Sequence, residues 1–144
     1  MSIAHLLAGK GRGVITIQPE DSIRQALGLL AQHNIGALIV VDSRQQPVGI
    51  LSERDIVREA ARNEGVFTQP VSALMTTDVV IGGPQDDLHS VAHTMIERRI
   101  RHLPVMESGT LVGIVSIGDV VKAQRDQYQG EVETMQTQLL ANKT

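Results

Sequence analysis

The residues of this chain whose types and spacing suit binding chemistry lie in two copies of one short pattern. The first copy is GILSERD, residues 49–55, and the second is GIVSIGD, residues 113–119. Each copy reads Gly-Ile, an aliphatic residue, Ser, two variable residues and Asp. A serine hydroxyl and backbone N–H groups at a helix start can bind a phosphate. A carboxylate three residues further on can accept hydrogen bonds from neighbouring sugar hydroxyls.

The same residues also have a purely structural interpretation. Serine is a preferred N-cap residue, and an acidic residue three positions later lies in the first helical turn, near the positive end of the helix dipole. On the Ser-x-x-Asp spacing alone, each copy predicts a buried strand that ends at the serine and leads into a capped helix. A binding role gains support only from the way in which the surrounding chain repeats.

The elements around the two copies repeat at a nearly constant distance. Pro84 and Asp86 stand 65 residues after Pro19 and Asp21. The offset falls to 64 at the second copy because the turn before it is one residue shorter, a change that loops tolerate. Apolar residues at i, i+3, i+4, i+7 and i+8 predict an amphipathic helix in each half. These residues are Ile23, Ala26, Leu27, Leu30 and Ala31 in the first half and Leu88, Val91, Ala92, Met95 and Ile96 in the second.

The repeat predicts the fold class and the organisation of the chain. We expect the α/β (α+β) class, with two pseudo-symmetric β-α-β-β-α units, residues 3–66 and 70–128, packed sheet to sheet. Residues 129–144 are expected to form a polar C-terminal helix or tail. A short helix is predicted within residues 1–13, and residues 71–75 echo it. Strands are predicted at residues 14–17, 37–41, 48–52, 79–81, 102–106 and 111–116.

The composition excludes several classes of function. The chain has 144 residues, a net charge of −3, no cysteine and only two aromatic residues, Phe67 and Tyr128. A disulfide framework and a thiolate zinc site are therefore excluded, and we expect neither a nucleic-acid partner nor a membrane partner. No stretch approaches 18 apolar residues, and the N-terminus lacks the pattern of a secretory signal, so we expect a cytoplasmic protein.

With this repeat, the chain resembles the paired CBS domains named after cystathionine β-synthase, a pair often called a Bateman module. The resemblance rests on G-h-x-S-x-x-D (h, aliphatic) at each second strand–helix junction, on the register of the helical stripes and on the I-x-x-L-P-V run at residues 100–105. It covers roughly residues 3–128. It implies a regulatory protein without enzyme activity or a required cofactor, which binds AMP, ADP, ATP, NADH or S-adenosylmethionine between its units. It also implies a homodimer that signals to a separate effector protein.

The resemblance further implies nucleotide-binding roles for particular residues. Ser52 and Ser116 would bind phosphate, and Asp55 and Asp119 would bind ribose. Because aromatic residues are so few, aliphatic strand residues would hold the adenine ring. The candidates are Val14, Thr16, Val79, Val80, Ile50 and Ile114.

The two units differ in the basic residues that could bind phosphate. Arg101 and His102 stand where some family members place side chains that contact phosphate, whereas the first unit has Gly36 and Ala37 there. The first unit instead carries Arg54 inside its motif, and arginine suits bidentate phosphate contacts. We therefore expect the second site, at Ser116 and Asp119, to be the better formed for a phosphorylated ligand.

Two other functions were weighed against this one. Catalysis is disfavoured because the chain has no cysteine nucleophile, no nucleophile elbow and no P-loop. His89 and His93 could chelate a metal from one helix, but no third ligand is evident, so we interpret them as solvated and predict no metal site. The main alternative is a dimerising structural or interaction module with empty clefts, because capping alone favours the same Ser and Asp residues. The choice among the adenosine ligands, and between one filled site and two, stays open.

Overall fold

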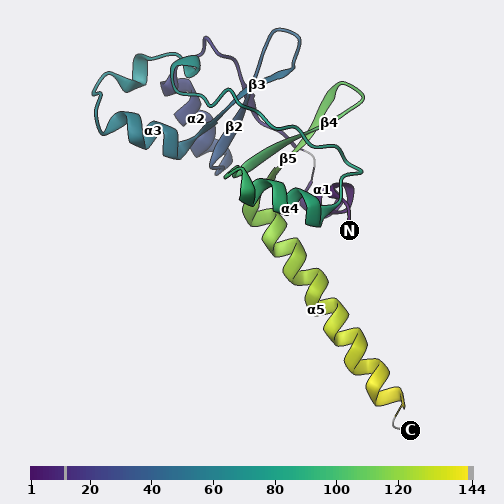
Figure 1. Cartoon of the computed structure of the whole chain (residues 1–144). Coiled ribbons are helices and arrows are strands. Elements are labelled where there is room, and N and C mark those ends of the chain that lie inside the picture. Colours follow the sequence, from purple (N-terminus) through teal and green to yellow (C-terminus); the bar gives the residue numbers. More distant parts are fainter. Residues whose placement is uncertain (12, 143–144) are drawn as a thin grey trace.

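The first half of the chain folds as a small sheet flanked by helices. A computed structural model describes residues 1–11 and 13–142. Figure 1 shows two halves side by side, with one long helix projecting from them. The first half contains α1 (Ile3–Lys10), β1 (Thr16–Ile17), α2 (Ile23–His33), β2 (Ala37–Val41), β3 (Pro47–Ser52) and α3 (Glu53–Ala60).

The second half repeats this order with shorter opening elements. Two 3₁₀ turns, η1 (Val66–Thr68) and η2 (Val71–Ala73), connect the halves, and η2 stands where the repeat places an echo of α1. The remaining elements are α4 (Leu88–Glu97), β4 (His102–Glu107), β5 (Thr110–Ser116) and α5 (Ile117–Asn142). The two predicted helices begin at equivalent caps, because Ser22 caps α2 and Asp87, 65 residues later, caps α4.

The strand predicted at residues 79–81 is absent, and this prediction was wrong. In the first half, β1 pairs in parallel with β2 through Ile17 and Val40. The equivalent pair 65 residues later, Gly82 and Val105, is only an isolated bridge. Extending the parallel ladder towards residue 80 would require an N–H at position 104 of β4, and Pro104 has none. The second sheet therefore holds only β4 and β5, whereas the first has the order β1-β2-β3.

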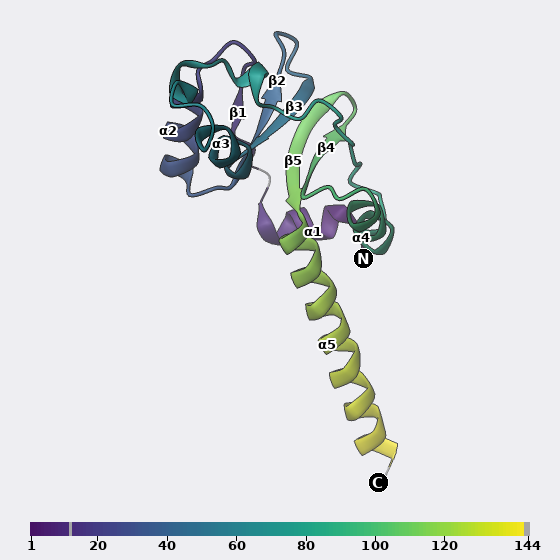
Figure 2. The same ribbon diagram turned by 60° about the vertical axis from the view of Figure 1, so that its left-hand side comes forward.

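The two sheets pack against each other, as predicted. Leu38 and Val40 of β2 belong to the core of the first half. The opposite face of the same strand is also buried, since Ile39 is 0% exposed and Val41 is 2% exposed. Figures 1 and 2 both show the sheet of the second half beside β2 and β3. The predicted mixed α/β class with two related units is therefore confirmed.

The halves exchange the segments that open them. We call α1 and residues 71–75 the leading segments. Ile3 and Leu7 of α1 are fully buried in the core of the second half, with α4, β4 and β5. Val71 of the other leading segment is buried in the core of the first half. The cores therefore divide the chain differently from the repeat boundaries at residues 3–66 and 70–128.

The exchange explains the glycine that opens each motif. A Cβ atom at Gly113 would lie 2.8 Å from Leu7 Cδ2. At Gly49 it would lie 2.6 Å from Met75 Sδ and 3.1 Å from the backbone oxygen of Thr76. Each leading segment thus packs so closely against the motif strand of the other half that an added Cβ atom would force neighbouring atoms to shift.

The C-terminal segment extends the last helix of the second half. α5 runs without a break from Ile117 to Asn142, so the boundary expected between residues 128 and 129 falls inside one helix. Its first turns reach the core through Val120 and Ala123. Beyond them the helix leaves the body of the molecule in both views (Figures 1 and 2), and Tyr128 is 69% exposed. Within the described ranges, no helix is long and apolar enough to span a membrane.

Candidate functional site

Both motifs form the capped helix starts that their spacing predicts. At the junction of β3 and α3, the Ser52 N–H donates to Asp55 Oδ2 at 3.0 Å, and the Asp55 N–H donates to Ser52 Oγ at 3.2 Å. At the junction of β5 and α5, the N–H of Ser116 donates to Asp119 Oδ2 at 2.9 Å, and that of Asp119 donates to Ser116 Oγ at 3.0 Å. In both motifs the capping bonds use a single carboxylate oxygen.

A cleft of about 870 Å³ opens between the halves at the first motif. Ser52, Arg54 and Asp55 line it from the first half, and Arg101 and His102 line it from the second. The structure therefore brings together residues that stand up to 50 positions apart in the chain. The other lining residues are Gly36, Ile50, Glu53, Arg58, Thr76, Asp78, Val80, Arg98, Arg99 and Ile100.

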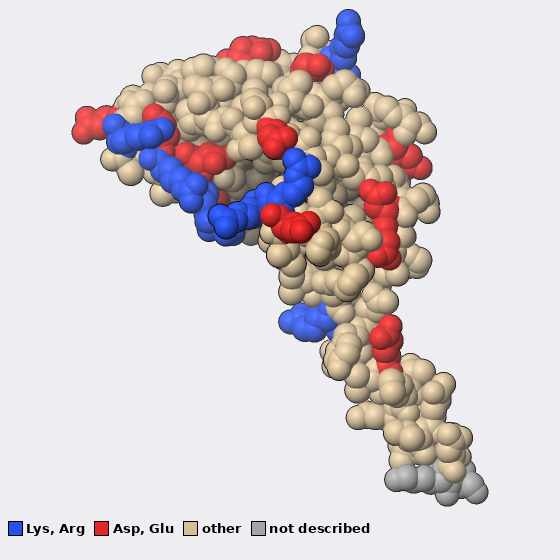
Figure 3. Space-filling model, viewed as in Figure 1, with Lys and Arg blue, Asp and Glu red and all other residues tan. Residues whose placement is uncertain are grey.

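The cleft is basic although the chain is acidic overall. Five arginines line it against three acidic residues, whereas the whole chain carries a net charge of −3. Figure 3 shows lysine and arginine side chains gathered in an arc along the rim of a hollow. Arg98 is held by Asp78 at 3.5 Å, and both side chains are at least half exposed. Arginines in such a rim suit an anionic ligand with several oxygens.

Basic residues of the second half line the cleft at the first motif. From the sequence we assigned Arg101 and His102 to the site of Ser116 and Asp119. The structure shows that both line the cleft of Ser52 and Asp55, although His102 also pairs with Ser116 in the β4–β5 ladder. Of the other candidates, Ile50 and Val80 line this cleft. The described lining does not include Val14, Thr16, Val79, Ile114, Ser116 or Asp119.

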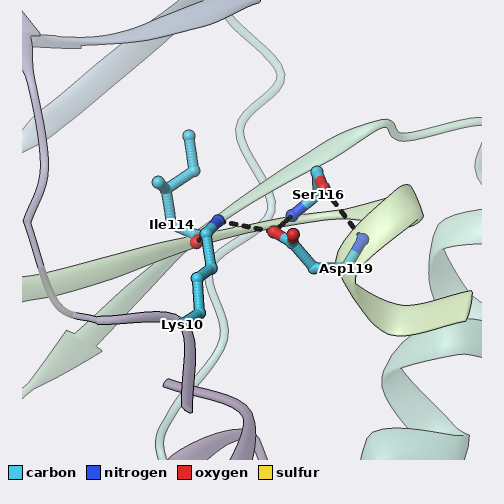
Figure 4. A network of polar contacts seen from close by, with 4 residues as sticks. All are labelled: Lys10, Ile114, Ser116 and Asp119. Carbon is cyan, nitrogen blue, oxygen red and sulfur yellow. Dashed lines mark hydrogen bonds and ion pairs between the residues drawn. The ribbon is translucent and has the colours of Figure 1, made fainter. Parts of the chain in front are cut away.

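At the second motif, Lys10 forms an ion pair with Asp119 (Figure 4). The Lys10 ammonium donates to Asp119 Oδ2 at 2.5 Å and to the Ile114 carbonyl oxygen at 2.7 Å. Burial opposes ionisation of Asp119, but hydrogen bonds from Lys10 and Ser116 outweigh it and lower the pKa of the carboxyl. Sequence reasoning missed Lys10, since no feature of residues 1–13 showed that α1 packs against the second half.

His102 lies between the two motifs. It is half-buried at the start of β4. Burial is the largest cause that lowers its pKa, and the positive charges of Lys10 and Arg101 lower it further, while Asp119 and Asp55 act in the opposite direction. One imidazole therefore experiences the charges of both strand–helix junctions.

The two histidines considered as metal ligands have other contacts. His93 Nε2 lies 3.4 Å from Glu97 Oε2, and His89 Nδ1 lies 3.4 Å from Gln124 Nε2. A search of the described residues finds no cluster of three or more metal-ligating side chains.

Two pseudo-symmetric units with a cleft between them define a tandem-repeat α/β module. The family model of the CBS domain matches residues 11–62 and 71–126, one match for each unit. The chain therefore belongs to the CBS domain family, as the resemblance predicted.

Similar proteins share both the fold and the extent of this chain. The CBS domain-containing protein YhcV of Bacillus subtilis is 36% identical over 111 residues, which span 77% of this chain and 79% of that protein. The crystal structure of the CBS-domain containing protein ATU1752 from Agrobacterium tumefaciens is 42% identical, with a TM-score of 0.80, and covers 86% of this chain and 99% of that one.

A third similar protein was crystallised with ligands. The CBS domain pair of protein MJ0100 was solved in complex with 5′-methylthioadenosine and S-adenosyl-L-methionine. It is 26% identical to this chain, with a TM-score of 0.78, over 88% of this chain and 98% of that one. A CBS pair of this fold can therefore bind adenosine-based ligands.

Proposed function

We propose that this protein is a regulatory module of the cytoplasm that binds an adenosine nucleotide between its two units and signals to a separate effector protein. The observation that carries the proposal is the basic cleft in which Ser52, Asp55 and Arg101 converge from both halves. A ligand in this position contacts both units. It can therefore shift their relative packing, provided that it binds the two arrangements with different affinity.

The cleft offers a partner for each part of a nucleotide. The start of α3 at Ser52, with Arg54 beside it, suits phosphate groups. The Asp55 carboxylate uses one oxygen for its capping bond, and its other oxygen can accept hydrogen bonds from ribose hydroxyls. Ile50 and Val80 supply an aliphatic surface for the adenine ring. These roles follow the assignments made from the family resemblance.

The charge of the cleft favours a phosphorylated ligand. MJ0100 binds the uncharged nucleoside 5′-methylthioadenosine and the cationic S-adenosyl-L-methionine. Both ligands contain adenosine, which supports adenosine as the group that such a cleft recognises. Five arginines in the cleft of this chain favour AMP, ADP, ATP or NADH over either of those compounds. We propose these nucleotides as regulatory ligands, and no further cofactor is required.

We propose a homodimer as the functional unit, because closed two-fold assembly is the commonest oligomer type. The exposed part of α5, from residue 128 onwards, is a plausible contact for a second copy or for the effector, since Met135 and Leu139 are more than 60% exposed on it. Deleting residues 129–144 tests this role. A shortened chain that keeps its oligomeric state and its partner contacts would show that this part of α5 is not a contact surface.

A second candidate function is a dimerising interaction module with empty clefts. The capping bonds support it, since they account for Ser52, Asp55, Ser116 and Asp119 without any ligand. Capping does not, however, explain why arginines from both halves face one cleft.

Calorimetric titration of nucleotide-free protein with AMP, ADP, ATP, NADH and S-adenosylmethionine separates the two candidates. We expect binding of a phosphorylated member of this panel, and loss of that binding in Asp55→Asn and in Arg101→Ala. Asparagine keeps an acceptor for the Ser52 N–H, so the helix cap survives the first substitution. Asp126→Asn, on the exposed side of α5, is the matched control. If no compound in the panel binds, the interaction module is the better description.

A further inference from the structure

The Lys10 ammonium lies against the aspartate of the second motif and against the strand that leads into it. It contacts Asp119 Oδ2 at 2.5 Å and the Ile114 carbonyl oxygen at 2.7 Å (Figure 4). The Asp119 carboxylate and Ile114 are the residues that correspond, 64 positions later, to Asp55 and Ile50 of the open cleft. Lys10 therefore satisfies the Ile114 carbonyl oxygen, shares Asp119 Oδ2 with the capping N–H of Ser116, and places its positive charge beside the carboxylate.

Packing, and not chance surface contact, brings Lys10 to this place. Lys10 is the last residue of α1, whose Ile3 and Leu7 are fully buried in the core of the second half. Leu7, one turn before Lys10, lies against Gly113 of the motif strand. The end of α1 is thus fixed beside β5, and the Lys10 and Asp119 side chains are each about one-third exposed.

Among the described residues, no lysine or arginine forms a comparable ion pair with the aspartate of the first motif. At the position equivalent to Ile114, the Ile50 carbonyl oxygen accepts a bond from the backbone N–H of Thr76 at 2.9 Å. This backbone N–H is neutral and donates its hydrogen bond to the Ile50 carbonyl oxygen, so it does not contact the Asp55 carboxylate. Within the part of the chain that the structure describes, the one hydrogen bond to the Asp55 carboxylate comes from its own capping partner, Ser52.

We infer that Lys10 is a specificity-determining residue, which closes the second motif to ligands and so directs nucleotide binding to the cleft at Ser52 and Asp55. The inference rests on the proposed function, since it decides which of two related sites takes the ligand. A ribose hydroxyl approaching Asp119 meets a carboxylate whose charge the Lys10 ammonium already neutralises. The same hydroxyl meets an Asp55 carboxylate that carries only its capping bond.

The test is the number of nucleotides bound per chain, measured by calorimetry with AMP and with ATP. We expect one site in the natural protein, lost in Asp55→Asn and kept in Asp119→Asn. We expect Lys10→Met to gain a second site, which Lys10→Met/Asp119→Asn loses again. Methionine retains the unbranched apolar stem of lysine as far as Cε and removes the charged ammonium. Lys122→Met, which removes an exposed lysine from α5, is the matched control and should keep one site.

Each outcome decides the inference separately from the proposed function. Two sites in the natural protein, or no Asp119-dependent site in Lys10→Met, would overturn the inference. A natural protein that binds nothing, with a Lys10→Met variant that binds at Asp119, would overturn the proposed role of the first cleft and support only the closing of the second motif by Lys10.

An NMR titration checks the ion pair without any ligand. Lys10 lowers the pKa values of both Asp119 and His102. In Lys10→Met and in Lys10→Gln, both values should rise relative to the natural protein, while Lys122→Met should leave them unchanged. Unchanged values in folded Lys10 variants would show that the ion pair does not form in solution, and the inference would fail.

Discussion

Asp55 and Asp119 hold equivalent positions in the repeat and nevertheless face different surroundings. Both accept a hydrogen bond from the N–H of the serine that caps their helix. Asp119 also receives the Lys10 ammonium, whereas Asp55 lies in a cleft with five arginines along its lining. The surroundings, and not the motif, decide how strongly such a carboxylate attracts a ligand, because a neighbouring fixed cation neutralises its charge.

His102 makes the stability of the protein depend on pH. Its folded-state pKa lies below the ordinary value of 6.5, chiefly because of burial. As pH falls below about 6.5, the unfolded chain therefore takes up the proton first, and the free energy of unfolding decreases until the folded state is protonated as well. Above that range His102 is neutral in both states and contributes no pH dependence.

The prediction is tested with urea unfolding curves between about pH 4.5 and pH 8. The natural protein should lose stability as the pH falls through the range just below 6.5, and His102→Gln should lose less. His33→Gln, at the exposed end of α2, is the control for removal of a histidine. An unchanged pH profile in His102→Gln would contradict the assignment.

Among the elements, the motif strands β3 and β5 depend on glycine where the leading segments cross them. A Cβ atom at Gly49 would meet the backbone oxygen of Thr76 at 3.1 Å, and one at Gly113 would meet the Leu7 side chain at 2.8 Å. A side chain can shift more easily than backbone can. Both alanine substitutions should therefore destabilise the protein by about 1–3 kcal/mol, with the larger loss at Gly49.

Denaturant unfolding of Gly49→Ala and Gly113→Ala measures these losses. Gly130→Ala is the control, because it lies in α5 with nothing within 4 Å of its added Cβ, and it should stabilise the helix by up to about 1 kcal/mol. Near-neutral results at both motif glycines would show that the leading segments do not pack against β3 and β5 in solution.

The elements also show what the sequence could and could not predict. Helix caps depend on local chemistry, so the spacing alone correctly predicted the caps formed by Ser52 with Asp55 and by Ser116 with Asp119. The prediction of a strand at residues 79–81 was wrong because its hydrogen bonds to β4 would need an N–H from a distant residue, Pro104, which has none.

At the scale of the whole molecule, the exchange of leading segments limited the prediction of the site. The repeat correctly indicates two related units, because periodicity records which faces are buried. It does not record which core an apolar segment enters, and α1 and η2 suit either half by composition. For this reason Lys10 was missed at the second motif, and the cleft that Arg101 and His102 line together with Ser52 and Asp55 was not predicted.

The exchange also couples the stability of the halves in a way that substitutions can reveal. Leu7→Ala removes buried methyl groups from a residue that lies early in the first half of the sequence but in the core of the second half. A Leu→Ala change in a core costs about 2–5 kcal/mol. Hydrogen exchange should therefore lose protection first in α4, β4 and β5, and α2 and β2 should keep theirs longer.

Val71→Ala is the reciprocal variant, because Val71 is fully buried in the first core although it opens the second repeat. Its loss of protection should begin in α2, β2 and β3. The two exchange maps should thus be mirror images, each variant loosening the half to which its residue does not belong in the sequence. If each variant instead loosened its own half, or both maps were uniform, the leading segments would not be exchanged in solution. The position of Lys10 at Asp119 would then lose its structural basis, because only the exchange brings α1 to β5.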